Sequence, residues 1–254
     1  MLVHEYLHSI QYRVNEKTRQ EEPLFDMEIG IRYSVNMDSF SEGATDLIRL
    51  ELNSRLNIYS RFMSYPGESF AVYEVAHAIG QQRFWTLFAK GDLENIFLEF
   101  EKKYGEGSAE RLFDSFYGGV ALCNPFWTSS ASAIPKYEML KKQGLLSDER
   151  FSEFSKQYKA YFPPVSEKFI NGPKGSMAFV NIINGKDIQM AIRDSAGKFT
   201  IITEESPLEG EVLLIEIPEL KAPWDFYRTC VTYEERQEAW EKIKSAVSDY
   251  IRPL

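Results

Sequence analysis

Two histidines and a glutamate near the start of the chain have the residue types and the spacing of a metal site. His4, Glu5 and His8 form the pattern HExxH. On a helix, residues i and i+4 lie on one face, so the two imidazoles could bind a single tetrahedral ion. Glu5 could reach a water molecule on that ion, and zinc lowers the pKa of such a water to roughly 7. The pattern therefore predicts metal-assisted amide hydrolysis, for which HExxH is the recognised short motif.

The alternative is an amphipathic helix that happens to contain two histidines. Short motifs do occur by chance in unrelated sequences. However, the whole chain has 3 histidines, and two of them lie one helical turn apart on either side of a glutamate. This distribution favours the metal site.

A third metal ligand is expected in the segment SEGATD (41–46), because a catalytic zinc site uses three protein ligands and one open position. Glu42 lies early on a predicted helix and Asp46 follows at i+4. A histidine ligand also needs a hydrogen-bond acceptor for its other ring nitrogen, which Asp46 could provide. Each residue has a simpler interpretation: Glu42 as a first-turn glutamate favoured by the helix dipole, and Asp46 as a solvated helix residue.

HExxH followed by Glu42, Thr45 and Asp46 resembles the pattern of the gluzincins, the thermolysin-like zinc metallopeptidases, whose second motif is Glu-x-x-Ser/Thr-Asp. The resemblance implies that Asp46 accepts a hydrogen bond from a ligand histidine. It also implies zinc ligation by His4, His8 and Glu42, with Glu5 as the base that activates the water. The expected cofactor is therefore Zn2+.

A hydrogen-bond donor should stabilise the negative oxygen that forms when a peptide carbonyl is attacked. Tyr65, Tyr73 and His77 are candidates. The segment 65–80 resembles the one that follows the glutamate helix in the aminopeptidase branch of gluzincins, and this implies that the Tyr65 hydroxyl is the donor. Glu68 occupies the position where that branch usually has glycine. We interpret Tyr73 as a core residue and His77 as a helix residue packed against the core.

The hydrophobic periodicity predicts a mainly helical first part of the chain, with most of 15–38 as loop and the segment SYPGES as a turn. Ser39 or Ser41 could cap the second helix, and Asp92 the fifth. The predicted helices are 1–13, 39–56, 68–79, 81–90, 92–104, 108–117, 135–143 and 147–161.

Short β-branched runs then predict strands, and Asn184-Gly185 between the first two indicates a hairpin. The predicted strands are 177–183, 187–194, 198–203 and 211–217. A capping box of Thr232 and Glu235 predicts a last helix at 233–251. We therefore expect an α+β fold: a helical, gluzincin-like catalytic domain at 1–162, then a small antiparallel β module with a C-terminal helix at 163–254.

Charge and hydrophobicity limit the classes of binding partner that the chain is expected to have. The net charge of −9 is spread along the chain, which argues against nucleic acid. There is neither a basic amphipathic run nor an apolar stretch of membrane-spanning length, so we expect no membrane partner.

Cys123 and Cys230 lie far apart and are interpreted as free thiols.

Only three residues precede His4, which leaves no room for a signal peptide or for the β-sheet that precedes this helix in gluzincins. We expect either a start other than Met1 or a fragment of a longer enzyme; a genuine start would indicate a cytoplasmic protein. The predicted function is hydrolysis of a peptide or protein substrate. The alternative is a catalytically inactive, gluzincin-like binding module, and the sequence leaves the oligomeric state open.

Overall fold

The computed structural model defines an α+β fold made of two compact units. The first unit contains the described residues up to Phe154, and the second those from Ser155 onward. The residues that the structure describes are 12–14, 21–23, 32–33, 35, 37–56, 66–117, 138–159, 161, 163, 165–183, 187–204 and 211–254.

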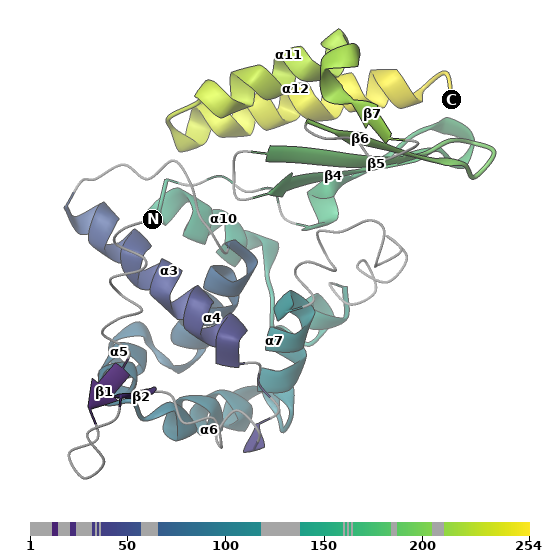
Figure 1. The fold of residues 1–254 in the computed structure, drawn as a ribbon. Helices are drawn as coiled ribbons and strands as arrows, with labels where there is room; N and C mark the ends of the chain where they lie inside the picture. Colours follow the sequence, from purple (N-terminus) through teal and green to yellow (C-terminus); the bar gives the residue numbers. More distant parts are fainter. Residues whose placement is uncertain are drawn as a thin grey trace. The chain divides into compact units, whose positions relative to one another are not determined.

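The first unit is mainly helical (Figure 1). It also holds one small antiparallel pair of strands, β1 (Tyr12–Val14) and β2 (Glu21–Pro23). The long helices α3 and α4 pack on each other. The helices are α3 (Met37–Arg55), α4 (Pro66–Ile79), α5 (Gln81–Ala89), α6 (Leu93–Tyr104), α7 (Ser108–Tyr117), a short helix at 138–142, and α10 (Asp148–Gln157), which runs on into the second unit.

Aromatic side chains from several helices form the core of the first unit. Phe40 of α3 contacts Phe97 of α6 and Phe113 of α7, with ring centroids 5.2 and 5.4 Å apart in edge-on geometry. All three are 0 % exposed. Burying residues of this size supplies most of the favourable free energy of such a helical unit, since each aromatic removes a large apolar area from water. These three phenylalanines therefore tie α3, α6 and α7 together in one core.

Several boundaries differ from the sequence prediction. Residues 12 and 13 belong to strand β1, not to a helix, and β2 lies in the predicted loop 15–38. Helix α3 begins at Met37, so Ser39 and Ser41 lie inside it and cannot cap it. The predicted turn SYPGES is helical from Pro66, because proline has a helical φ and its missing N–H is one that the first turn leaves unbonded. The Asp92 cap is confirmed: its side chain accepts from the Asn95 amide at 3.4 Å.

The second unit contains a five-stranded sheet in the order β3-β4-β5-β6-β7. Neighbouring strands are antiparallel except β6 and β7, which are parallel, so the sheet is mixed and the predicted purely antiparallel sheet is wrong on this point. The strands are β3 (Phe169–Asn171), β4 (Met177–Ile183), β5 (Asp187–Arg193), β6 (Phe199–Thr203) and β7 (Glu211–Leu213).

The predicted strand 211–217 ends early, at Leu213, and continues as a 3-10 turn, Leu214–Glu216. Leu214 and Ile217 are buried, whereas Ile215 is exposed. A three-residue repeat brings positions i and i+3 to the same side, so the turn buries two apolar side chains that a strand would point to opposite faces.

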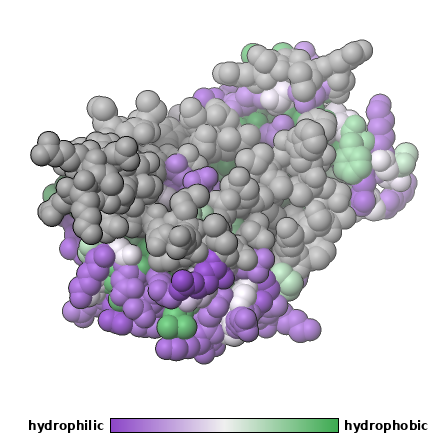
Figure 2. Space-filling view, turned by 60° about the horizontal axis from the view of Figure 1, so that its bottom comes forward, coloured by the Kyte–Doolittle hydropathy of each residue, from purple (hydrophilic) through white to green (hydrophobic). Residues whose placement is uncertain are grey.

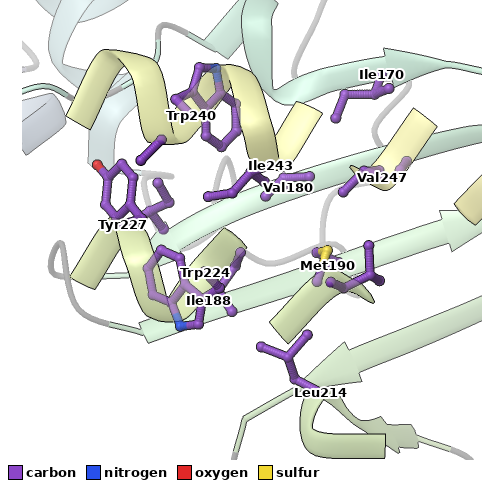
Figure 3. Packing of buried hydrophobic residues seen from close by; sticks show 14 of the residues in the cluster. Ile170, Val180, Ile188, Met190, Leu214, Trp224, Tyr227, Trp240, Ile243 and Val247 are labelled. Carbon is purple, nitrogen blue, oxygen red and sulfur yellow. The ribbon is translucent and has the colours of Figure 1, made fainter. Parts of the chain in front are cut away.

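Two helices, α11 (Pro218–Thr229) and α12 (Tyr233–Ile251), cover one face of this sheet (Figure 1). Their side chains, including Trp224 and Trp240, pack on Val180 and Ile188 of the sheet (Figure 3). The bounds of α12 and its capping box agree with the sequence prediction, whereas α11 was not predicted. None of the helices in the described part of the chain is long and apolar enough to cross a membrane.

Candidate functional site

The residues predicted to form the site fall into two groups. His4, Glu5, His8 and Tyr65 lie outside the described residues. Glu42 and Asp46 are described, and both lie on α3. Within the described ranges, no group of three or more His, Cys, Asp and Glu side chains has the arrangement of a metal site. The described part of the candidate site is therefore the part that α3 and α4 form.

Helix α3 positions Glu42 and Asp46 one turn apart on the same face. Glu42 is half-buried, and Asp46 is completely buried. The simpler interpretation of Asp46 as a solvated helix residue is therefore wrong. A buried carboxylate is costly unless other groups compensate its charge, so the contacts of Asp46 decide what it can do.

Asp46 is held by a buried ion pair on its own helix. Its Oδ1 accepts from Nε of Arg49 at 2.7 Å, and Nη2 of Arg49 lies 2.7 Å from the same oxygen. The two side chains are 0 % and 7 % exposed. From α4, the Ser69 hydroxyl donates to Oδ2 at 3.4 Å. These contacts fix the orientation of the carboxylate and offset its charge inside the unit.

Glu68, in the first turn of α4, is the third carboxyl of this region. Its burial raises its pKa to about 7, a hydrogen bond from its own backbone opposes the rise, and the negative charges of Asp46 and Glu42 add to it. Asp46 and Glu42 are thus close enough to Glu68 for their charges to disfavour its ionisation. The sequence analysis considered Glu68 only as a replacement for the glycine of the gluzincin pattern. Glu68 lies against Gly43 of α3, and a contact between residues this far apart in the chain has no local sequence signal.

The other candidate donors lie elsewhere on α4. Tyr73 is a core residue, 5 % exposed, as predicted. His77 is exposed, so the prediction that it packs against the core is wrong; its ring stacks on Tyr73 with centroids 6.4 Å apart. Four residues separate the two, so one helical turn brings them together while the end of α4 leaves His77 in solvent.

A shallow depression of about 550 Å³ lies between the end of α3 and α5, and polar side chains form most of its lining. The depression is separate from the candidate site, because Glu51, which lines it, faces away from Glu42 on α3 at 3.6 residues per turn. The lining residues are Glu51, Arg55, Gln81, Gln82, Trp85, Thr86 and Ala89.

The face shown in Figure 2 is largely hydrophilic where its residues are described, with scattered apolar residues.

The described fold and site define an α+β protein whose helical unit carries a buried, ion-paired aspartate beside two further carboxyl groups. Cys230, in the second unit, is a buried free thiol, in line with the sequence prediction. Comparison of the chain with protein-family models, with curated proteins and with solved structures found no match.

Proposed function

We propose that the protein is a zinc-dependent peptidase of gluzincin type. The observation that carries the proposal is the pairing of HExxH in the sequence with Glu42 and Asp46 on one face of α3. The complete burial of Asp46 supports it further, because a carboxylate that orients a ligand histidine works from behind the metal, away from solvent.

The donor set fits zinc. Two imidazoles and one carboxylate are a common ligand set of catalytic zinc sites. Glu42, the described member of the proposed set, is half-buried on a regular helix, so its carboxylate can be both accessible and well positioned. When bound, zinc would lower the pKa of a water ligand and polarise the scissile carbonyl.

In this proposal four residues of the chain have the other roles in catalysis. Glu5 takes a proton from the attacking water and passes it to the nitrogen of the leaving amine. The Tyr65 hydroxyl donates a hydrogen bond to the oxygen that becomes negative. Asp46 accepts a hydrogen bond from the ring nitrogen of a ligand histidine, while Arg49 holds the aspartate in position and offsets its charge.

Metal content and peptide hydrolysis test the proposal together. Purified protein should contain about one zinc per chain and hydrolyse a general peptide mixture, and a chelator should stop the reaction. Glu5→Gln should keep the zinc but lower the turnover by a factor on the order of 10² to 10⁴, because the base is lost and the ligands remain. If Glu5→Gln cleaves peptides as fast as the wild type, the proposed mechanism is wrong.

Glu42 provides the matched test of the third ligand. Glu42→Gln should lower zinc affinity, since a neutral amide replaces a carboxylate ligand. Glu51→Gln is the control: it makes the same chemical change on the same helix, at a position that faces away from Glu42. Equal zinc affinity in both variants would remove Glu42 from the ligand set.

The alternative function, a catalytically inactive binding module, makes a different prediction in the same assays. Such a protein would contain zinc, or lose it readily, without hydrolysing any peptide of the mixture. Its Glu5→Gln variant would be indistinguishable from the wild type. Zinc at one per chain together with chelator-sensitive hydrolysis excludes it.

A further inference from the structure

The depression between the end of α3 and α5 has a lining that the proposed zinc site does not use. Its volume is about 550 Å³, within the range of small-molecule sites in proteins. Most of its lining is polar, but the indole of Trp85, on α5, also forms part of it. Polar side chains beside an aromatic ring are suited to a ligand that has hydroxyl groups and an apolar C–H face in the same molecule.

Packing holds Trp85 in place while part of its side chain stays at the surface. Its ring meets those of Phe84 and Phe88 edge-on, with centroids 4.8 and 5.8 Å apart. Phe84 is 0 % exposed, so this contact fixes the indole to the core of the helical unit. Trp85 itself is half-buried. Its exposed part therefore has a fixed position, and a ligand that binds to it has less conformational entropy to remove.

The hydrogen-bonding groups of the lining come from Gln81, Gln82 and Thr86, in the first two turns of α5. All three side chains are exposed. A glutamine amide has N–H donors and an acceptor oxygen. The Thr86 hydroxyl donates to the Gln82 carbonyl oxygen at 2.8 Å, so its lone pairs can accept from a ligand. Hydroxyl groups of a ligand, which both donate and accept, match this set of donors and acceptors.

The charged residues of the lining neutralise each other. Nε of Arg55 donates to Oε1 of Glu51 at 2.8 Å, one turn earlier on α3. The other described residues of the lining are uncharged. The side chains of the depression therefore have no excess charge with which to attract a phosphate or a carboxylate, and its ligand should be neutral.

We propose that this depression binds a neutral sugar, with one face of the pyranose ring against Trp85 and hydroxyl groups hydrogen-bonded to Gln81 and Gln82. The C–H groups on one face of a pyranose can pack on an indole, while its hydroxyl groups project from the rim of the ring. Because the depression is shallow, much of the ligand stays in water, and a monosaccharide should bind with a Kd on the order of 1–10 mM. The depression is separate from Glu42, so sugar binding should not require zinc.

NMR titration of the tryptophan indole N–H signals tests the sugar site. The chain has 4 tryptophans, and the signal of Trp85 is identified by its loss in Trp85→Phe. The probes are glucose, galactose and N-acetylglucosamine, each added to about 50 mM so that the titration covers the expected Kd. At least one of them should shift the Trp85 signal and approach saturation. A signal that none of the sugars shifts would overturn the proposal. A shift with inorganic phosphate alone would also overturn it and would indicate an anion site.

Two exposed glutamines provide a matched pair of variants that should both keep the fold. Gln82→Ala removes one amide from the depression and should raise the Kd of the responding sugar by about 3- to 10-fold, the effect of losing one hydrogen bond. Gln237→Ala makes the same change at an exposed position of α12, and it should leave the Kd unchanged. Both titrations follow the Trp85 signal. Equal Kd values in the two variants would contradict the proposed contact between the sugar and Gln82.

Discussion

Gly43 of α3 lies directly against the backbone of Glu68 at the start of α4. A Cβ atom at position 43 would be 2.4 Å from the Glu68 carbonyl oxygen and 2.5 Å from its carbonyl carbon. Only a residue without a side chain allows the two helices to approach this closely. The contact lies beside Glu42 and one turn from Asp46, so it sets the spacing between the two helices at the candidate site.

We predict that Gly43→Ala destabilises the helical unit by about 1–3 kcal/mol, in spite of the higher helix propensity of alanine. The added methyl group would meet backbone atoms, which cannot move aside as a flexible side chain would. Urea unfolding followed by circular dichroism measures the change. Ser54→Ala, at an exposed position of the same helix, is the control and should stay within about 0.5 kcal/mol of the wild type.

Two ion pairs on α3 differ in burial and should therefore contribute differently to the free energy of unfolding. Arg49→Met leaves the buried Asp46 carboxylate without its guanidinium partner and should cost about 3–5 kcal/mol. Arg55→Met removes an exposed pair with Glu51, in which Arg55 is 74 % exposed, and should cost at most about 0.5 kcal/mol. Chemical denaturation of both variants checks the prediction; similar losses would contradict the structural role given to the buried pair.

The stability of the wild type should depend on pH through Glu74. Its pKa is about 7 in the folded protein against an ordinary 4.5, so the folded chain retains this proton over a range in which the unfolded chain has lost it. The stabilisation is complete below pH 4.5, declines as the pH rises to about 7, and is absent above. The expected loss is on the order of 3 kcal/mol. Urea unfolding between pH 4.5 and 8 should show this slope in the wild type and a smaller one in Glu74→Gln.

In the second unit, the capping box at the start of α12 should contribute measurably to stability. The Thr232 hydroxyl accepts from the Glu235 amide at 3.1 Å, and the Glu235 carboxylate accepts from the Thr232 amide at 3.0 Å. Thr232→Ala should cost about 0.5–2 kcal/mol. Ser245→Ala, at an exposed position of the same helix, is the matched control. Thermal unfolding of both variants measures the difference, and an unchanged melting temperature for Thr232→Ala would contradict it.

Local signals predicted the elements whose own sequence has a clear hydrophobic period or a cap. Strand β4 and helix α12 have the bounds that periodicity and capping gave, and Asp92 caps α6 as expected. The errors lie where tertiary contacts overrule a local pattern. The end of β7 is one example: the burial of Leu214 and Ile217 turns an apparent strand into a 3-10 turn. Helix α11, which contains Pro218 and Pro223, is another, since its buried Trp224 and Tyr227 outweigh the low helix propensity of proline.

For the candidate site, the sequence supplied the residue types, and the structure supplied the surroundings of those on α3. HExxH was identified from its spacing, and Glu42 and Asp46 from their resemblance to the second motif of the gluzincins. The Arg49 guanidinium that offsets the charge of Asp46, and the shift in the pKa of Glu68, depend on burial and on contacts between helices, which spacing does not encode. The zinc ligation itself stays a prediction.

The sequence by itself determined the α+β class, the order of most elements, and the proposal of a metal-assisted hydrolysis, because hydrophobic periodicity, capping and motif spacing are properties of neighbouring residues. Tertiary structure alone decided that β7 runs parallel to β6, that Gly43 admits α4 against α3, and that Glu74 meets Arg150 across a separation of 76 residues. These relationships arise from the packing of distant segments, where burial changes both the space and the charge that a side chain can have.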